Sequence, residues 1–528
     1  MRSFDYVVIG AGAAGCIVAN RLVRRARASV LLVEAGHDSS SIYLRMPAGF
    51  AFASKQPEFD WGLNSESEAG LGGRTMPCPR GKLVGGSSAV NAMAFVRGHP
   101  GDFDEWAEVA GRQWTFERCL PYFRSLETFS GGADRHRGGE GPFHVKAPGY
   151  SNPLYQEFLL ACVQAGYAIS KDTNGAVQEG FGPMDQNIHK GLRESSATAF
   201  LDPVRKDPKL TLLTEALVER VHLVGRRAVD VVLRNRSGQE VVAANREVIL
   251  CAGAIHSPHL LMLSGIGPAD QLRNAGVDVL HDAPAVGRNL QDHVDISLRE
   301  ACPQPITESL VLRQDRKILI GLEWILFKTG KGTTNHFEVA GYIATRASKR
   351  PNIQICFMPL LVAWDGAPSL KSRHGYQISI MLLRPESRGS VDLESSDPRV
   401  PPKLRFGYLT APGDVAQLRE GLAAARRIVS QSAMAPFTSE EIAPGAEVAE
   451  DAAIEAWIRS TAKSTHHPCG TCAMGLDPRT SVVDPAGLVH GLDGLRVVDS
   501  SIIPLITGGN LNAPTMMVAE KIVSEMTG

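Results

Sequence analysis

The beginning of the chain constrains the fold more than any other feature of the sequence. Residues 6–9 form a short β-branched apolar run, which is typical of a buried strand. A glycine-rich turn follows, then a segment with helical spacing over 16–25, and a second apolar run over 30–33 that ends at Glu34. A strand, a turn, a helix and a strand that ends in an acid are what a dinucleotide-binding unit requires. The glycines of the turn are Gly10, Gly12 and Gly15.

Each conspicuous residue of this unit has a physical role. Gly10 permits the tight turn, Gly12 lets the backbone approach a pyrophosphate, and Gly15 lets the helix pack closely on the strand. The start of the helix offers free N–H groups and the positive end of its dipole to phosphates. Glu34 is expected to accept hydrogen bonds from ribose hydroxyls. The motif alone leaves open NAD or FAD, and also a glycine-rich turn without a ligand.

Length and charge restrict the class of protein. A chain of 528 residues exceeds the usual single domain of about 100–200 residues, so two large domains are expected. The 55 basic residues nearly balance the 56 acidic ones, which gives no electrostatic argument for binding nucleic acid. Nine scattered cysteines, no recognisable leader peptide and no apolar run of membrane-spanning length favour a cytoplasmic protein. Peripheral association with a membrane stays open.

The rest of the chain mixes strand and helix patterns. Residues 47–106 are rich in loops, and a loop region of this length inside a domain is usually functional. Residues 208–250 alternate as antiparallel strands do. Further strands are predicted at 377–383 and 495–498, and helices at 257–264, 414–430 and 514–526.

Four further motifs, in order along the chain, resemble those of the glucose–methanol–choline (GMC) oxidoreductase family. Gly81 to Asn91 resembles the family's first signature, and Gly253 to Gly267 its second. His467 to Cys472 is similar to the segment of the catalytic histidine, and Gly509 to Pro514 to the closing flavin-site segment. Choline dehydrogenases and aliphatic alcohol dehydrogenases of the family look closest.

The resemblance implies an α/β chain, α+β overall, with two domains. A Rossmann-like FAD-binding domain, discontinuous in sequence, would comprise residues 1–155, 195–295 and 465–528. A substrate domain with an antiparallel sheet and helices would comprise 156–194 and 296–464.

The resemblance also implies that FAD is the cofactor. Its expected contacts, beside the turn glycines, are Ala13, Ala14, Glu34, Ala35, Gly86, Asn91, Ala94, Val218 and Asp499. Some family members link FAD covalently to a histidine just before the position of Asn91. Here that position is Val90, and valine cannot form the link, so we expect FAD to be bound non-covalently.

Oxidation of an alcohol needs a base for the hydroxyl proton and an acceptor for the hydride. His467 matches the family's catalytic histidine, and the ordinary pKa of imidazole suits a general base. Asn512 matches its partner, and Asn510 is the second candidate for that role. His466 could line the pocket or perturb its neighbour. A metal is not expected, because Cys469 and Cys472 form only one cysteine pair.

The substrate side is less specific. Trp61 and Glu338 resemble pocket positions of choline-oxidising members, where a carboxylate and aromatic faces hold a quaternary ammonium. A protonated His466 would repel such a cation, so we expect an uncharged primary alcohol, oxidised to its aldehyde, with choline as the alternative. The electron acceptor is expected to be oxygen, or a quinone or other carrier, and the oligomeric state is left open.

Three other functions compete with this reading. A nicotinamide-dependent dehydrogenase would share the first motif but not the first signature or the C-terminal pair of histidine and asparagine. A flavoprotein lyase stays open because the family includes hydroxynitrile lyases. A flavin-binding protein without catalysis is the third alternative.

Overall fold

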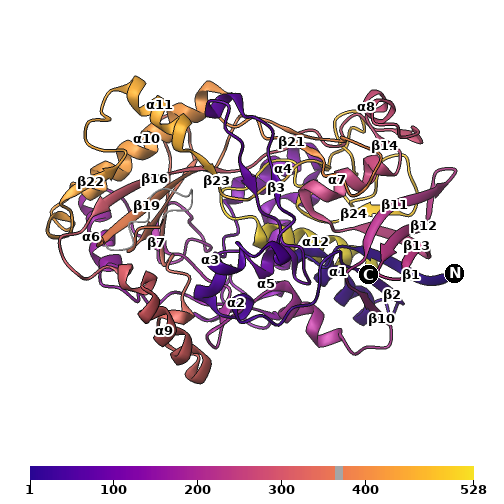
Figure 1. Cartoon of the computed structure of the whole chain (residues 1–528), viewed down its shortest axis with the longest axis horizontal. Helices are drawn as coiled ribbons and strands as arrows, with labels where there is room; N and C mark the ends of the chain where they lie inside the picture. Colours follow the sequence, from indigo (N-terminus) through magenta and orange to yellow (C-terminus); the bar gives the residue numbers. More distant parts are fainter. Residues whose placement is uncertain (363–372) are drawn as a thin grey trace.

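The structure, a computed structural model, describes residues 1–362 and 373–528. The molecule is elongated, with a mixed sheet at one end and an antiparallel sheet at the other (Figure 1). Helices cover both sheets, which confirms the expected mixture of α/β and α+β structure. Both termini lie at the end that carries the first sheet.

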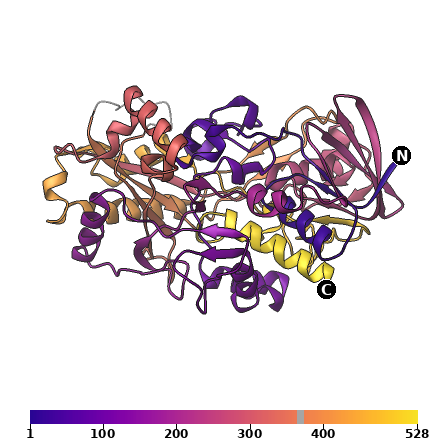
Figure 2. The same cartoon turned by 90° about the horizontal axis from the view of Figure 1, so that it is seen from below.

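The first sheet is built on the N-terminal unit. β1 (Arg2–Ile9) pairs in parallel with β2 (Val30–Val33) on one side and with β13 (Gly238–Leu250) on the other. β10 (Leu210–Leu213) adds to β2, and β24 (Leu495–Val497) adds to β13, both in parallel. Helix α1 (Ala13–Arg24) packs against the C-terminal helix α12 (Asn512–Thr527), as Figure 2 shows.

Two strands pair in the direction opposite to the expected one. Residues 208–250 were expected to alternate as antiparallel strands do, but β10 is parallel to β2, with Leu210 opposite Val30, and β13 is parallel to β1. Only β11 (Leu217–Val224) and β12 (Arg227–Asn235) extend β13 in antiparallel fashion. Alternation along a strand reports which faces are buried, and it carries no information on the direction of the neighbouring strand.

The second sheet is antiparallel and lies at the other end. It contains β7 (Gly180–Pro183), β16 (Val294–Ala301), β17 (Val339–Ile343), β18 (Ile353–Met358), β19 (Gly375–Leu382), β22 (Glu440–Ala443) and β23 (Lys463–Ser464). One face packs on α10 (Pro412–Val429), where a Cβ on Gly421 would lie 2.7 Å from Ile380. The absence of a side chain at this position lets the helix approach the sheet closely.

Short elements and loops join the two sheets. The remaining α-helices are α2 (Ile42–Arg45), α3 (Phe50–Ala53), α4 (Pro100–Ala110), α5 (Phe116–Leu126), α6 (Leu154–Gln164), α7 (Gly253–Leu263), α8 (Ala269–Asn274), α9 (Gln314–Phe327) and α11 (Asp451–Thr461). The remaining strands are β3 (Leu63–Asn64), β4 (Pro77–Cys78), β5 (Glu127–Phe129), β6 (Phe143–Val145), β8 (Ile188–His189), β9 (Leu192–Arg193), β14 (Ile266–Gly267), β15 (His281–Asp282), β20 (Ser390–Asp392) and β21 (Lys403–Arg405). The domain boundaries given above stay a prediction.

Candidate active site

The three glycines of the turn between β1 and α1 serve two purposes: two are required by close packing of the protein, and one leaves space for a ligand. A Cβ on Gly15 would lie 1.9 Å from the carbonyl oxygen of Gly10, and a Cβ on Gly10 would lie 2.6 Å from that of Cys251. On Gly12, by contrast, a Cβ would meet no described atom nearer than 4.0 Å. Gly12 also stands at the N-terminus of α1, where no side chain caps the first N–H groups of the helix. The turn can therefore hold a phosphate.

Glu34 lies at the end of β2 and is tied to the turn. Its two carboxylate oxygens accept hydrogen bonds of 2.9 Å from the backbone N–H groups of Ala11 and Gly36. Burial raises the pKa of Glu34 to about 7. Its carbonyl accepts the N–H of Ala216, which places the start of β11, and with it Val218, beside the same strand end.

The first signature lies across the turn. The N–H of Gly85 donates to the carbonyl of Ala11 at 2.8 Å, and a Cβ on Gly86 would lie 2.8 Å from the Cα of Gly12. Both Gly85 and Gly86 adopt positive φ, where a side chain would strain the backbone. Gly85 and Gly86 therefore bring residues 85–91 next to the phosphate-binding turn.

Asn91 and Ala94 lie on a segment that the surrounding chain holds firmly. The Oδ1 of Asn91 accepts from the N–H of Met93 and from the guanidinium of Arg193, each at 2.9 Å. Ala94 pairs with Gln186 in an isolated β-bridge.

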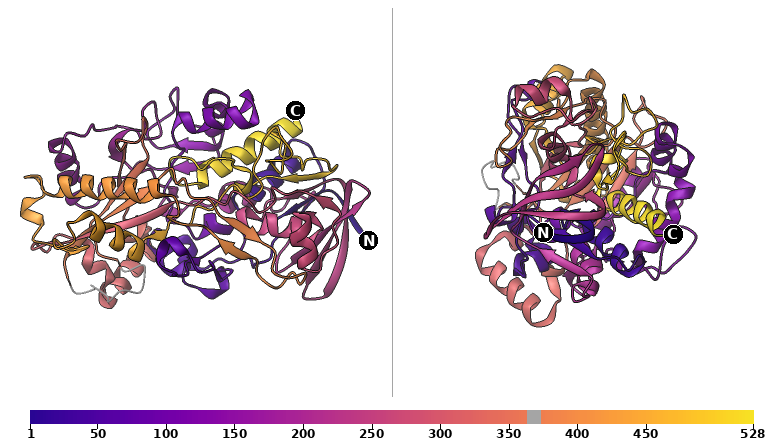
Figure 3. Two further views of the ribbon diagram at one scale, coloured as in Figure 1. Left: turned by 90° about the horizontal axis from the view of Figure 1, so that it is seen from above. Right: turned by 90° about the vertical axis from the view of Figure 1, so that its right-hand side faces the viewer.

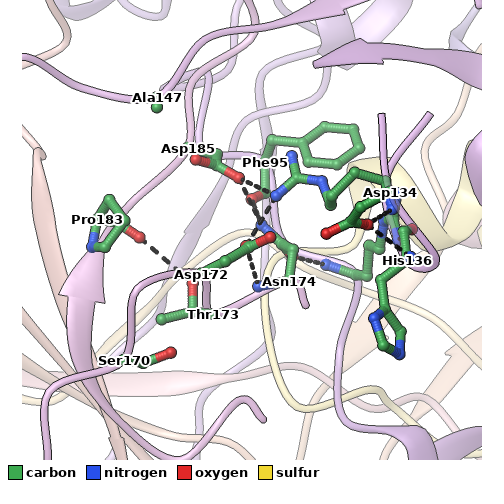
Figure 4. A network of polar contacts seen from close by, with 12 residues as sticks. Phe95, Asp134, His136, Ala147, Ser170, Asp172, Thr173, Asn174, Pro183 and Asp185 are labelled. Carbon is green, nitrogen blue, oxygen red and sulfur yellow. Dashed lines mark hydrogen bonds and ion pairs between the residues drawn. The ribbon is translucent and has the colours of Figure 1, made fainter. Parts of the chain in front are cut away.

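A buried polar network fixes the residues that follow Ala94. The amide of Asn174 donates to the carbonyl of Phe95 and to Asp185, each at 3.0 Å (Figure 4). Arg137 bridges Asp185 and Asp172 at 2.8 Å each, and it also contacts Glu127 at 3.0 Å. Buried charges persist only when they are paired in this way, so the network ties segments distant in sequence together.

Asp499 connects the end of β24 to the start of α7. Its carboxylate accepts from the N–H of Gly253 at 2.8 Å, from the hydroxyl of Ser257 at 2.6 Å and from the N–H of Ser501 at 2.8 Å. Burial raises its pKa, and the hydrogen bonds oppose that rise. The neighbouring Cys251 donates its N–H to Ile9, so Asp499 also lies close to the glycine turn.

His467 is held at both ring nitrogens. Its Nε2 lies 3.0 Å from the amide nitrogen of Asn510, and its Nδ1 lies 3.0 Å from both Thr465 Oγ1 and His293 Nδ1. Its backbone N–H donates to Asp292 at 2.7 Å. Desolvation by the surrounding protein, with smaller contributions from His293 and His466, holds the pKa of His467 well below its ordinary value. The imidazole is therefore neutral near pH 7 and can take up a proton.

Asn510, rather than Asn512, is the residue that contacts the imidazole. Asn512 is the first residue of α12, two positions further along the chain. Both residues carry a buried polar atom without a hydrogen-bond partner in the described part of the chain, namely Oδ1 of Asn510 and Nδ2 of Asn512. A buried unpaired amide atom is costly, so a ligand is expected to satisfy both.

His293 is a neighbour that the sequence patterns did not indicate. It is one of 15 histidines and stands in no recognised motif. It is fully buried, and its Nε2 lies 3.1 Å from the carbonyl oxygen of Leu383. Burial lowers the pKa of His293 to about 4. The only sequence signal is the adjacent Asp292, and nothing in the spacing links it to residue 467.

His466 does not contact the ring of His467; its Nδ1 lies 3.3 Å from Ser464 Oγ. It adopts a positive φ of 65°, and its carbonyl accepts a hydrogen bond of 2.7 Å from Arg80. Its side chain is exposed, and the neighbouring cations Arg80 and Lys463 lower its pKa. The ring is therefore neutral near pH 7, and the repulsion of a cationic substrate considered above does not arise from it.

Trp61 and Glu338 are already engaged by other residues. The ring of Trp61 packs on His256 at 4.0 Å between centroids, and the ammonium of Lys82 lies 4.8 Å from the Trp61 ring. The Glu338 carboxylate is buried and accepts three hydrogen bonds, two from Ser151 and one from Thr334. Contact of either residue with a substrate stays a prediction.

Two family models cover most of the chain, the N-terminal GMC oxidoreductase domain over residues 4–295 and the C-terminal one over 385–519. The chain belongs to the GMC oxidoreductase family. It is 44% identical over 526 residues to the oxygen-dependent choline dehydrogenase of Brucella suis, covering 99% of this chain and 95% of that protein. Among solved structures it resembles pyridoxine 4-oxidase from Mesorbium loti, with a TM-score of 0.90, 32% identity and coverage of 99% and 98%. A formate oxidase variant from Aspergillus oryzae matches with a TM-score of 0.93, 25% identity and the same coverage.

Membership confirms that the protein is an FAD-dependent oxidoreductase that acts on alcohols. The residues of this chain fit that cofactor. The open space at Gly12, the uncapped start of α1 and the unpaired amide atoms of Asn510 and Asn512 are features that a bound dinucleotide and its substrate would use.

Val90 bears on the expectation that FAD is bound non-covalently, and Cys469 and Cys472 bear on the expectation that no metal is bound. Val90 packs on a cluster that includes Leu44 and Leu83, and it offers no nucleophile for a covalent flavin link. Cys469 and Cys472 are fully buried, and the described residues contain no group of three or more potential metal ligands. Within the same residues, no helix is both long enough and apolar enough to cross a bilayer.

Proposed function

We propose that this GMC oxidoreductase converts a primary alcohol to its aldehyde with His467 as the general base. The contact between His467 Nε2 and the Asn510 amide carries the proposal. An alcohol oxygen placed beside both groups would give its proton to the imidazole and accept a hydrogen bond from the amide. Bound FAD supplies the two-electron acceptor for the hydride that leaves the carbinol carbon.

Hydrogen-bond partners assign the tautomer of His467. A carbonyl oxygen can only accept, so His293 must carry its proton on Nε2, where it faces Leu383. Neutral His293 then accepts at Nδ1, and His467 must donate from its own Nδ1. This leaves the lone pair of His467 on Nε2, where it accepts from the Asn510 amide until a substrate hydroxyl takes the place of that hydrogen bond. After proton uptake, the Nδ1–H of the imidazolium keeps its acceptor.

We propose that the FAD-binding residues are those expected from the sequence. Those at the turn and the end of β2 are Gly10, Gly12, Ala13, Ala14, Gly15, Glu34 and Ala35, and the others are Gly86, Asn91, Ala94, Val218 and Asp499. The contacts of Glu34 and Gly86 with the turn, and of Asp499 with the start of α7, which follows the strand paired with β1, support this assignment.

We propose an uncharged primary alcohol as the preferred substrate. A quaternary ammonium needs a free carboxylate and open aromatic faces to offset its desolvation. Here three donors occupy Glu338, and the Lys82 ammonium lies over Trp61, where it would repel a second cation. Choline is the second candidate, and the identity to oxygen-dependent choline dehydrogenases favours it. The same relatives favour oxygen as the electron acceptor, with a quinone as the alternative, and we place the enzyme in the cytoplasm.

One experiment tests both parts of this proposal. The purified enzyme is mixed without oxygen with choline and with neutral aliphatic and aromatic primary alcohols, and the flavin absorbance is followed; each reaction is then repeated with oxygen. Neutral alcohols should bleach the flavin with the higher kcat/KM. If choline exceeds them by about tenfold, or about 1.4 kcal/mol in transition-state binding, choline is the substrate. If no alcohol reduces the flavin, the lyase or the non-catalytic alternative replaces this function.

A further inference from the structure

Helix α9 turns its apolar side away from the protein. Its residues Ile318, Leu319, Leu322, Ile325 and Leu326 fall on one side of a helix with 3.6 residues per turn, and Phe327 ends it. The first five side chains, called here the α9 apolar face, are 49–68% exposed, and Phe327, on an adjoining side of the last turn, is 69% exposed. The opposite side holds the helix in place, because Trp324 is buried and donates its indole N–H to Gly191 at 2.7 Å. An amphipathic helix of a soluble domain has the reverse orientation.

Exposed aromatic side chains flank α9. The rings of Tyr43 and Phe52 stack at 5.7 Å, and both are about 40% exposed. Lys317, which shares a side of α9 with Trp324 seven positions further on, lies 5.2 Å from the ring of Phe52, so α3 adjoins the packed side of the helix. An exposed apolar helix face with exposed aromatic side chains at its flank marks an interaction site.

Basic residues surround this surface. Residues 313–331 contain five Lys or Arg and only two Asp or Glu, although the whole chain has a net charge of −1. Arg45 and Lys55, next to α2 and α3, are exposed as well. An apolar face with cationic flanks is complementary to a bilayer with anionic headgroups, where lysine and arginine meet phosphate and the apolar side chains enter the acyl boundary.

The shape of the surface favours a bilayer over a second copy of the chain. In Figures 1 and 3, α9 stands out from the body as a ridge. A helix of 14 residues is about 21 Å long, so a face about 10 Å wide presents about 200 Å². A stable protein interface needs about 800 Å² from each partner. A bilayer requires no complementary groove, and an interfacial helix enters it by about 5–10 Å.

We propose that α9, with Tyr43 and Phe52, is a docking surface for an anionic membrane. The helix lies in the plane of the interface and anchors the enzyme reversibly, without crossing the bilayer.

Vesicle flotation of the full-length holoenzyme tests this assignment. Vesicles of phosphatidylcholine alone are compared with vesicles that also contain phosphatidylglycerol, at low and high salt. The wild type should float with the anionic vesicles and less so at high salt. The double variant Leu322→Ser/Leu326→Ser should bind about tenfold more weakly, because it removes two large apolar side chains from the insertion face. Arg316→Glu should weaken binding to the anionic vesicles only.

The control is Leu476→Ser, because Leu476 is 65% exposed but follows the catalytic-histidine segment rather than lying on α9. It should float as the wild type does. Flavin content and alcohol oxidation in detergent-free buffer should be the same in all variants, because none of these residues belongs to the active site. The proposal is overturned if the wild type does not float, if the double variant floats equally well, or if the wild type is a dimer that the double variant converts to a monomer.

Discussion

At the scale of single residues, the chemistry depends on a neutral imidazole with a defined tautomer. His467 receives its low pKa from desolvation and its orientation from His293, Thr465 and Asn510. Each of these contacts has a separate consequence that substitution can measure.

Substitution of the base should remove turnover without removing the cofactor. We expect His467→Ala to lower kcat by about 10²–10⁴-fold, the usual contribution of a general base. The flavin absorbance per chain should stay near that of the wild type, because the imidazole contacts Asn510, Thr465 and His293 rather than the glycine turn. Near-normal turnover in a flavin-loaded variant would exclude His467 from the mechanism.

The two asparagines should behave differently. Asn510→Ala removes the amide that contacts His467 and should lower kcat more than Asn512→Ala, which removes no contact of the imidazole. Steady-state kinetics of both variants at matched flavin content measure the difference. Equal losses, or a larger loss at Asn512, would return the role of the partner to Asn512.

His293 acts as a positioning residue, and the pH profile can show it. Its neutral Nδ1 accepts the Nδ1–H of His467 and so fixes the tautomer of the base, so His293→Leu should lower kcat with little change in KM. His293→Gln keeps an acceptor and should restore part of kcat, and kcat/KM measured against pH for both variants separates a loss of correctly protonated base from a loss of enzyme. A purely structural role would instead lower thermal stability and flavin content equally in both variants.

At the scale of elements, β1, the glycine turn and α1 form a unit whose glycines serve different purposes. Gly15 is required by the packing of the helix on the strand, whereas Gly12 leaves space that only a ligand would fill. Substitution can therefore distinguish the glycine that the fold requires from the glycine that the cofactor requires, although they lie within four residues of each other.

This difference predicts opposite outcomes for two alanine substitutions. Gly15→Ala places a methyl group 1.9 Å from a backbone oxygen, so the apoprotein should be destabilised and FAD lost. Gly12→Ala meets no described protein atom within 4.0 Å, so the apoprotein should keep its stability while FAD affinity falls at least tenfold. Thermal unfolding of both apoproteins, with titration by FAD, measures the two effects. Unchanged FAD affinity in Gly12→Ala would remove this residue from the phosphate site.

At the scale of the whole molecule, buried histidines link stability to pH. Burial lowers the pKa of His256 to about 3 and that of His259 and His293 to about 4, against 6.5 in an unfolded chain. Below pH 6.5 the unfolded state takes up protons that the folded state does not. The free energy of unfolding should therefore fall between pH 6.5 and about 4.

Urea unfolding at several pH values between 7.5 and 4 measures this loss. His259→Asn removes one of the three groups at a position outside the catalytic contacts, so its stability should depend less steeply on pH. An identical slope in the variant and the wild type would show that His259 is not the source of the linkage.

The sequence by itself determined the parts of this protein that depend on neighbours along the chain. The turn at Gly10–Gly15, the acid at the end of β2 and the histidine of the 467–472 segment are local patterns, because a helix start or a glycine turn is specified within a few residues. These patterns predicted the fold class, the cofactor and the family. Val90 likewise needed no structure to exclude a histidyl link.

Only the tertiary structure decided which distant groups meet. His293 lies 174 positions before His467, and Asn510 rather than Asn512 reaches the imidazole, because the path of the chain, not its spacing, brings side chains together. The parallel direction of β10 and the outward orientation of α9 follow the same rule: periodicity identifies an apolar face, but only the packed molecule decides whether protein covers it.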